Sequence, residues 1–393
     1  MRYFLIFFFA ISLFSCQDKS QITESYLGSY SRDTLYVKHE QECWLEAPHY
    51  DITDLIPLDL PSSYSDIDFH QIKVTKERIY VLDQKFNKTL FVFDRKGQFL
   101  FRMGKHGHAR DEFIDCPTYF DIDKSSGDAY IYECNSSRIL VFNNIGEYIR
   151  TIMIKGDLYP SSLVRMDDGR FLMAYSNPQV DISMIALSLH DDSLNLIKPL
   201  MNYTDEKRGR GLLWFDNTFF HDTRIAYTPF GADSVILFSG DKVEKVLKID
   251  FNGCYIPEEI MDQACSEGTW DQIFMHEGAQ FIDACEVTDS MIHIRYSFSK
   301  HRCNYVHYFS DKRSYNSQCE NFLKQINMGF LSSVYEDKLV YSLSADDVEL
   351  TKKIYQSYPK DIQTQLLKDA GSLYGKMLKG EIVGPAILMI KLK

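Results

Sequence analysis

Basic, imidazole and acidic side chains are concentrated in one short stretch of the chain, RMGKHGHARDE at 102–112. Its glycines and its position after an apolar run predict a connection between two strands. The cationic and imidazole groups could bind an anionic ligand, or the two histidines could bind a metal ion. The alternative, which we favour, is a solvated turn in which Glu112 accepts hydrogen bonds from neighbouring backbone amides. The candidate ligand-binding residues in this stretch are Lys105, His106, His108 and Arg110.

Aspartates at the ends of apolar runs form a second candidate site. Asp83, Asp121 and Asp123 all stand at such positions. Carboxylates that point toward a common axis could bind Ca²⁺ together with carbonyl oxygens. Aspartate at a strand end is equally an ordinary turn former. We therefore expect no resident cofactor, and we keep Asp121 and Asp123 as the candidate ligands should a metal ion bind.

A third pattern lies in HRCNYVH at 301–307, where His301, Cys303, Tyr305 and His307 alternate. A continuous strand would place all four on one face, and histidine together with cysteine suits Zn²⁺. However, residues 300–302 have the character of a turn, which would point His301 in another direction. We expect no zinc site at these positions.

Aromatic side chains are numerous, with 27 Phe, 25 Tyr and 3 Trp. Most stand at alternating positions of apolar runs, which predicts that they pack in the core. Trp214 and Trp270 instead fall in the connecting segments GLLWFDN and EGTWDQ. These two are the candidates for exposed stacking against sugar rings.

The first sixteen residues, MRYFLIFFFAISLFSC, have the organisation of an export signal. Arg2 precedes an apolar run that is shorter than the roughly 20 residues a membrane-spanning helix needs. The run ends in LFSC, which resembles a bacterial lipobox and implies lipidation of Cys16 after cleavage. An ordinary secretory signal is the alternative. We assign residues 1–15 to the signal peptide and 16–45 to a polar tether, so the chain would be anchored to the outer membrane of a bacterial envelope.

The composition excludes one class of partner. The 393-residue chain has a net charge of −12, whereas binding to nucleic acid needs clustered Lys and Arg. None of the eight cysteines after Cys16 stands in a CxxC pair, and a chain of this length can build a core without disulfides.

The fold class follows from a repeat. LFVFDRKGQFL at 90–100 returns as RILVFNNIGEYI at 138–149, each an apolar run, a polar turn with glycine and a closing pair. Four short strands in about fifty residues is the spacing of propeller blades. Looser copies follow, so residues 46–393 are predicted to form an all-β, six-bladed propeller of four-stranded blades. A helical insertion is expected at about 346–380, interrupted by Pro359, and the final strand PAILMIKLK should close the ring near DITDLIPLDL at 51–60.

The two clear units resemble NHL-repeat propellers. The resemblance rests on Asn87 and Gly97 in the first unit, and on Asn135, Arg138 and Gly146 in the second. The whole chain resembles the six-bladed propeller lipoproteins of Bacteroidetes, in the lipobox, the IPLDL run, the turn GKHGHARDEF and the terminal KLK. It lacks the proline that those proteins usually carry in this turn. The resemblance implies fold and location and no particular reaction.

Three functions are compatible with these features. The first is a lipid-anchored binding module for a glycan, a peptide or an envelope protein. The second is a Ca²⁺- or Zn²⁺-dependent propeller enzyme of the lyase or lactonase type, and the third is a structural subunit of an envelope complex. No GxSxG, SxxK, HExxH or P-loop motif is present. We favour the binding module, because likeness of fold alone cannot establish an enzyme.

Overall fold

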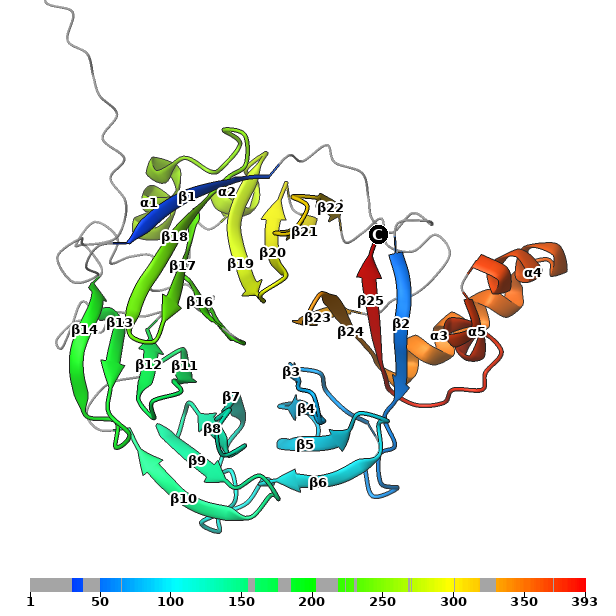
Figure 1. Ribbon diagram of the computed structural model, residues 1–393, viewed down its shortest axis with the longest axis horizontal. Helices are drawn as coiled ribbons and strands as arrows, with labels where there is room; N and C mark the ends of the chain where they lie inside the picture. The colour runs from blue at the N-terminus through cyan, green and yellow to red at the C-terminus, as the bar shows by residue number, and fades with distance from the viewer. Residues whose placement is uncertain are drawn as a thin grey trace, which may run out of the picture.

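The fold is a ring of six blades around a central axis (Figure 1). The computed structural model describes residues 30–37, 50–64, 66–154, 160–175, 185–202, 218–222, 224–229, 232–267, 269, 271–299, 301–318, 330–369 and 371–393. Each blade contains four antiparallel strands, so the predicted six-bladed β-propeller is confirmed.

Each of the first five blades is built from four strands that are consecutive in the chain and run in order from the axis outward. Blade 1 contains β3 (Gln71–Val74), β4 (Arg78–Asp83), β5 (Thr89–Asp94) and β6 (Phe99–Met103). Blade 2 contains β7 (Pro117–Ile122), β8 (Ala129–Glu133), β9 (Arg138–Phe142) and β10 (Tyr148–Met153). Blade 3 contains β11 (Ser162–Arg165), β12 (Phe171–Ala174), β13 (Ile185–His190) and β14 (Leu196–Asn202). Blade 4 contains β15 (Thr218–His221), β16 (Ile225–Thr228), β17 (Ser234–Ser239) and β18 (Lys242–Asp250). Blade 5 contains β19 (Ala279–Val287), β20 (Met291–Phe298), β21 (His301–Tyr308) and β22 (Ser314–Gln318).

The repeated apolar run is the third strand of a blade. All five residues of β9 and the first five of β5 are buried, because both faces of these strands pack against neighbouring blades. The glycine of the repeat follows each of them in the turn to the outer strand. Gly97 and Gly146 have φ of +86° and +87°, a conformation in which a Cβ atom is unfavourable. A Cβ on Gly97 would also lie 1.9 Å from the carbonyl oxygen of Pro57.

Both ends of the chain contribute to blade 6. Its strands, from the axis outward, are β23 (Phe330–Tyr335), β24 (Lys338–Leu343), β25 (Ala386–Leu392) and β2 (Tyr50–Pro57). The antiparallel pairing of β2 with β25 runs from Tyr50 opposite Leu392 to Pro57 opposite Ala386. The predicted closure of the ring by the two ends is therefore confirmed.

The boundary between tether and propeller lies earlier than the sequence predicts. Within the predicted tether at 16–45, β1 (Ser31–Tyr36) pairs in parallel with β18 and becomes a fifth strand at the rim of blade 4 (Figure 1). Val37, directly after β1, is buried against blades 4 and 5. Part of the predicted tether thus pairs with the propeller, a contact that the sequence does not predict because a parallel pairing with a strand more than 200 residues away leaves no local pattern.

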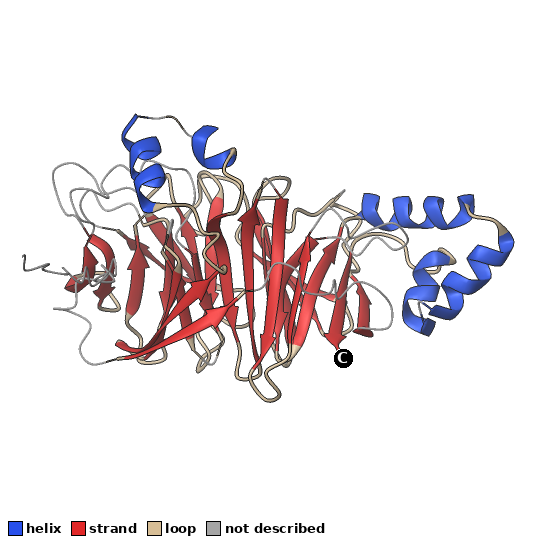
Figure 2. Ribbon diagram, turned by 90° about the horizontal axis from the view of Figure 1, so that it is seen from above, coloured by secondary structure: helices blue, strands red, loops and turns tan. Residues whose placement is uncertain are grey.

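Three helices form the predicted insertion between β24 and β25. They are α3 (Ala345–Ser357), α4 (Lys360–Asp369) and α5 (Gly371–Leu378), which extend from the side of the ring (Figure 2). Ser344 begins α3 with a capping box to Asp347, and Pro359 separates α3 from α4 as expected. Two short helices, α1 (Glu258–Glu267) and α2 (Asp271–Phe274), lie between blades 4 and 5 and were not predicted. None of the helices in the described ranges is long and apolar enough to cross a membrane.

Candidate functional site

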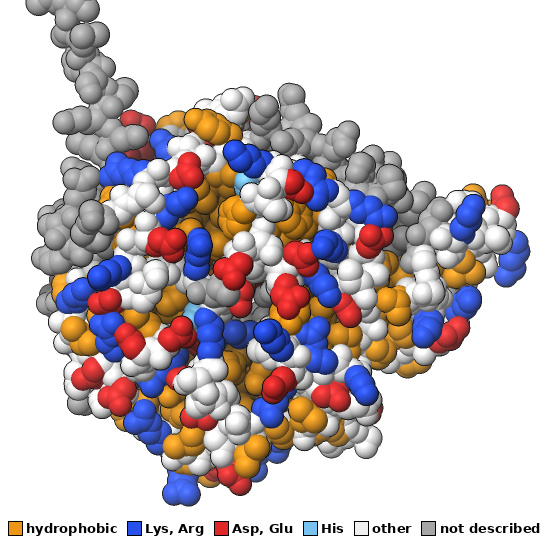
Figure 3. All heavy atoms as spheres, viewed as in Figure 1, with side chains coloured by type: hydrophobic (Ala, Val, Ile, Leu, Met, Phe, Trp, Pro, Cys, Tyr) orange, Lys and Arg blue, Asp and Glu red, His pale blue; other side chains and the backbone are white. Residues whose placement is uncertain are grey.

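A cavity of about 220 Å³ lies where the innermost strands of the six blades meet. All six blades contribute to its walls, and charged side chains gather around the centre of the ring face (Figure 3). The polar and aromatic residues that line it are His70, Gln71, Lys73, Thr118, Tyr119, Asp121, Ser161, Ser162, Phe219, Phe220, His221, Asp222, Glu286, Arg295, Ser332, Ser333 and Tyr335. This is the main candidate site.

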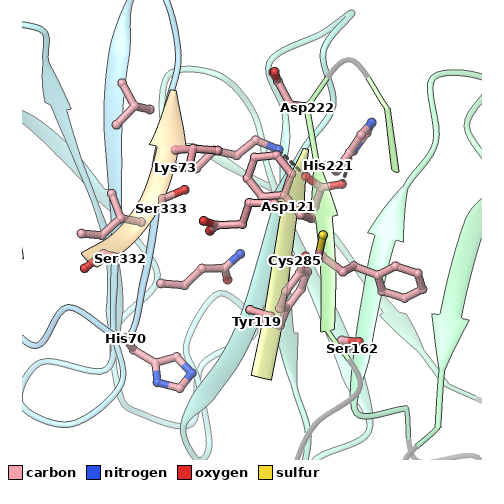
Figure 4. Close-up of a pocket in the computed structure, with 18 of the residues that line it drawn as sticks. His70, Lys73, Tyr119, Asp121, Ser162, His221, Asp222, Cys285, Ser332 and Ser333 are labelled. Carbon is pink, nitrogen blue, oxygen red and sulfur yellow. Dashed lines mark hydrogen bonds and ion pairs between the residues drawn. The ribbon is translucent and has the colours of Figure 1, made fainter. Parts of the chain in front are cut away.

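Asp121 of β7 joins four blades at this cavity. Its Oδ1 atom accepts hydrogen bonds from Lys73 Nζ of blade 1 at 2.6 Å and from the backbone amide of Ile122 at 2.9 Å. Its Oδ2 atom accepts from His221 Nδ1 of blade 4 and from the backbone amide of Arg165 of blade 3, both at 2.9 Å. Lys73 and His221 approach the carboxylate from different sides (Figure 4). Both oxygens are thus engaged in an ion-pair network across the axis.

The surroundings of Asp121 keep it ionised. Burial by itself would raise the pKa of this carboxyl, of which 1% is exposed. The Lys73 ammonium and the His221 ring outweigh burial and hold the pKa of Asp121 well below its usual range. The charge at this point of the axis is therefore fixed over the ordinary pH range.

Polar side chains at the start of β3 and directly before it form hydrogen bonds with the inner edge of β7. An innermost strand has a neighbour on one side only, so its other backbone groups need partners. The Gln71 amide donates to the carbonyl of Phe120 at 3.1 Å and accepts from the amide of Phe120 at 2.9 Å. His70 Nε2 lies 3.0 Å from the carbonyl oxygen of Thr118. Blades 1 and 2 are thus joined along the cavity wall, which gives the site a rigid base.

A second carboxylate, Glu286 of β19, belongs to the wall formed by blade 5. Its Oε2 atom accepts from His293 Nδ1 at 2.7 Å, and His293 Nε2 lies 3.1 Å from Oδ1 of Asn304. His293 and Asn304 are both buried, so this chain of polar groups leads from the interior of the blade to the cavity. Its effect is to hold Glu286 in one orientation.

The free energy of unfolding is expected to depend on pH through Asp283, which lies in β19 close to this wall. Burial raises its pKa to about 6, against the opposing effect of Arg295 and Arg302. An unfolded aspartate titrates near pH 4, so the stabilising contribution is complete below about pH 4 and is lost as the pH rises through about 6. Between pH 4 and 7 we expect the wild type to lose on the order of 3 kcal/mol more of its free energy of unfolding than Asp283→Asn. Urea unfolding at several pH values measures the difference.

The matched control for this prediction is Asp192→Asn, in the exposed turn between β13 and β14. This variant should follow the wild-type curve throughout. Parallel pH curves for wild type and Asp283→Asn would contradict the assignment of the dependence to Asp283.

The segment at 102–112 begins in β6 and then forms a closed loop outside the cavity lining. Gly107 and Phe113 are joined by a backbone hydrogen bond, and the buried Phe113 ring packs against Gly104. Glu112 accepts from the amide of Ala109 at 3.0 Å and pairs with Lys105 at 2.9 Å, and these contacts lower the pKa of Glu112. The geometry is that of the expected turn.

The other candidate ligands of this segment have different surroundings. The backbone of His106 forms an isolated β-bridge with that of Phe113. The Arg110 guanidinium lies over the ring of Tyr148, 5.4 Å from its centroid. His108 is exposed. None of the four candidates lines the cavity. Their role in ligand binding stays a prediction.

The two predicted metal ligands are held apart by different contacts. Asp121 lines the cavity, whereas Asp123 accepts from Ser125 and Ser126 in the turn after β7 and lies 3.6 Å from Arg165 Nε. Asp83 likewise accepts from the amides of Phe86 and Asn87 in a turn. Within the described ranges, no group of three or more His, Cys, Asp or Glu side chains could hold a metal ion.

The alternating residues of 301–307 form one continuous strand, β21. The expected turn at 300–302 is wrong by about two residues, because Ser299 takes the left-handed φ of +45° and His301 already pairs with Phe298. Cys303 is buried, and His307 Nδ1 lies 2.8 Å from Ser314 Oγ. Cys16, Trp214 and Trp270 lie outside the described residues.

The cavity residues that sequence reasoning missed share one position. Lys73, His221 and Glu286 each stand near the end of the first strand of a blade, as Asp121 does. A charged or imidazole side chain near the end of a strand that is mostly apolar is the signal that could have found them. It becomes visible once the repeats are aligned by strand, since every first strand faces the axis.

The family to which the protein belongs is shown by its sequence. A family model described as "Domain of unknown function (DUF4934)" matches residues 64–371, which include most of the ring. The chain belongs to this family. No curated protein matches the chain.

Solved structures similar to this member of the DUF4934 family share its fold. A protein from Bacteroides fragilis that is thought to be exported is 14% identical, with a TM-score of 0.72, over 92% of this chain and all of its own. A member of the DUF4221 family from Bacteroides vulgatus is 12% identical, with a TM-score of 0.54, over 88% of this chain and 98% of its own. At these identities the likeness concerns the fold alone.

Proposed function

We propose that this DUF4934 protein is an exported, lipid-anchored binding module that holds a small polar part of a glycan or peptide in its axial cavity. The observation that carries the proposal is a cavity walled by all six blades and lined with fixed charges, hydroxyl groups and aromatic rings. Binding sites of propellers and other scaffolds commonly combine such anchors in one concave place.

The size and rigidity of the cavity support a small ligand group. Its volume of about 220 Å³ is below the range of roughly 300–1,000 Å³ that accommodates drug-sized ligands. The polar anchors are preorganised, because the network at Asp121 already joins four blades before any ligand binds. Preorganised groups lose little conformational entropy on binding.

The location belongs to the same proposal. The signal-like start and the LFSC sequence support export and a lipid on Cys16. The similar protein from Bacteroides fragilis, thought to be exported, supports a place outside the cytoplasm. The proposed partners are the outer membrane, through the lipid, and a glycan, peptide or envelope protein at the ring. The proposed role needs no metal ion. A calcium or zinc site stays a prediction, and elemental mass spectrometry of the purified protein would test it by measuring the bound calcium and zinc.

Blocking the cavity is expected to abolish ligand binding. His70 and Asp222 line the cavity and are at least partly exposed, so His70→Trp and Asp222→Trp should fill it without disturbing the core. We expect ligands found on glycan and peptide arrays to bind the wild type and to bind either variant at least about tenfold more weakly by calorimetry.

The control is Glu349→Trp, on the exposed surface of α3, which should bind like the wild type. Ligand affinities that are equal in all four proteins would place binding elsewhere. If no array ligand binds, and an envelope protein binds all four proteins with equal affinity, the result would instead support the role of a structural subunit.

A further inference from the structure

Glu286 has one oxygen atom available to a ligand. Its side chain lines the cavity with 12% of its surface exposed, and Oε2 is occupied by His293. Among the described residues, none donates a hydrogen bond to Oε1. A largely buried carboxylate that is fixed on one side and open on the other is a strong acceptor for a ligand donor.

Asp121 cannot take this role. Each of its two oxygens already accepts two hydrogen bonds, from Lys73, Ile122, His221 and Arg165. A ligand donor at Asp121 would have to displace one of these partners. Lys73, by contrast, uses one of its three ammonium hydrogens on Asp121 and can donate the others to oxygen atoms in the cavity.

The charges of the lining favour a cation. The described lining contains three carboxylates, of Asp121, Asp222 and Glu286, and two cationic side chains, of Lys73 and Arg295. Lys73 is paired with Asp121, and the charge of Arg295 acts on the partly buried Asp283. No lysine or arginine of the described ranges lies within ion-pair distance of Asp222 or Glu286, although His293 pairs with Oε2 of Glu286 and Lys124 interacts electrostatically with Asp222. A cationic group in the cavity would balance their charge.

We propose, building on the function proposed above, that the bound group carries a primary ammonium next to an oxygen acceptor. The ammonium donates to Glu286 Oε1, and the neighbouring hydroxyl or carboxylate oxygen accepts from Lys73 Nζ. A neutral hydroxyl could also donate to Glu286, but only an ammonium adds the attraction between opposite charges to the hydrogen bond. Amino sugars and the free amino ends of amino acids or peptides share this chemistry.

The test compares amines with their acetylated forms. Calorimetry with the full mature chain would use D-glucosamine and N-acetyl-D-glucosamine, and L-alanyl-L-alanine and its N-acetyl form. Acetylation removes the positive charge and keeps the rest of the molecule. We expect at least one free amine to bind about tenfold or more tightly than its acetylated form, and the pair that shows this identifies the source of the ligand.

A charge-neutral variant isolates the role of Glu286. Glu286→Gln keeps a side-chain oxygen for His293 and should fold, which a melting temperature close to that of the wild type would verify. We expect it to lose about tenfold or more in affinity for the amine and to lose the preference over the acetylated form. Glu349→Gln, on α3, is the matched control and should change neither.

The outcomes separate this inference from the proposed function. Equal binding of free and acetylated probes, or unchanged amine binding by Glu286→Gln, would overturn the inference. In that case, suppose that the wild type binds a neutral array ligand and that His70→Trp and Asp222→Trp do not bind it. The wild-type cavity would then be a ligand-binding site, and the proposed function would stand. If no amine and no array ligand depends on the cavity, both proposals fail.

Discussion

An Asp121→Ala variant is expected to lose about 3–5 kcal/mol of the free energy of unfolding, the range for removing one partner of a buried ion pair. The carboxylate joins Lys73, His221 and the amide of Arg165, so its removal leaves a partly buried ammonium and an unsatisfied amide at the centre of the ring. Urea unfolding near pH 7 measures the loss.

The pH dependence of this loss has a defined sign. Because the pKa of Asp121 is lowered in the folded protein, its contribution is complete above the pKa of an unfolded aspartate, about 4, and is lost as the pH falls below that value. The difference between wild type and Asp121→Ala should therefore shrink under acid conditions. The Asp283 contribution changes in the opposite direction with pH, which allows the two to be told apart.

Asp51→Ala is the control, since Asp51 is 64% exposed and pairs with Lys393 at the surface. Removing such a pair should cost less than about 1 kcal/mol. A loss for Asp121→Ala that is no larger than the loss for Asp51→Ala would refute the central role of the Asp121 network. In that case the blades would be held together by apolar packing alone.

Deleting β25, by ending the chain after Gly384, is expected to abolish folding. β25 lies inside blade 6, between β24 and β2, so the deletion removes two strand pairings at once. Five of its apolar side chains, those of Ile387, Leu388, Met389, Ile390 and Leu392, are at most 1% exposed. At about 1.5–3 kcal/mol each, their burial is comparable with the whole stability of a typical domain, about 5–15 kcal/mol. Circular dichroism and size-exclusion chromatography would detect the loss of the native fold.

A shortened N-terminus gives the comparison for this deletion. A chain that begins after Val37 lacks β1, but blade 4 retains its four antiparallel strands. We expect this chain to fold with a moderately lower melting temperature. A β25 deletion that melts as cooperatively as the β1 deletion would show that the ring does not depend on its closing strand.

Sequence patterns were sufficient for the parts of the fold whose causes are local. The units around Leu90 and Arg138 predict blades, because buried third strands and a glycine turn are written into each copy. The helical insertion was predicted from composition and from the break at Pro359. Closure by β2 and β25 was also predicted, since an apolar strand at each end of the chain can pair to complete the last blade.

The candidate site was only partly accessible to the same reasoning. Asp121 was singled out as an inward-facing acid, but as a metal ligand, and its partners Lys73 and His221 lie 48 and 100 residues away in the chain. No pattern within a blade reports which side chains of other blades reach the axis. The segment at 102–112 is rich in chemically active residues, which suggests a binding site. In the structure Glu112 contacts Ala109 and Lys105 of the same segment, and the segment lies outside the cavity lining.

By itself, then, the sequence determined the propeller architecture, the helical insertion and the closing strands, because each depends on residues close together in the chain or on their spacing, and that spacing allows six or seven blades. Only the tertiary structure decided that β1 extends blade 4, that Asp121 is bound by Lys73 and His221, and that Glu286 retains an open oxygen. The physical reason is the ring itself. It brings six distant strands to one axis, where burial and charge pairing, rather than local preference, fix the state of each side chain.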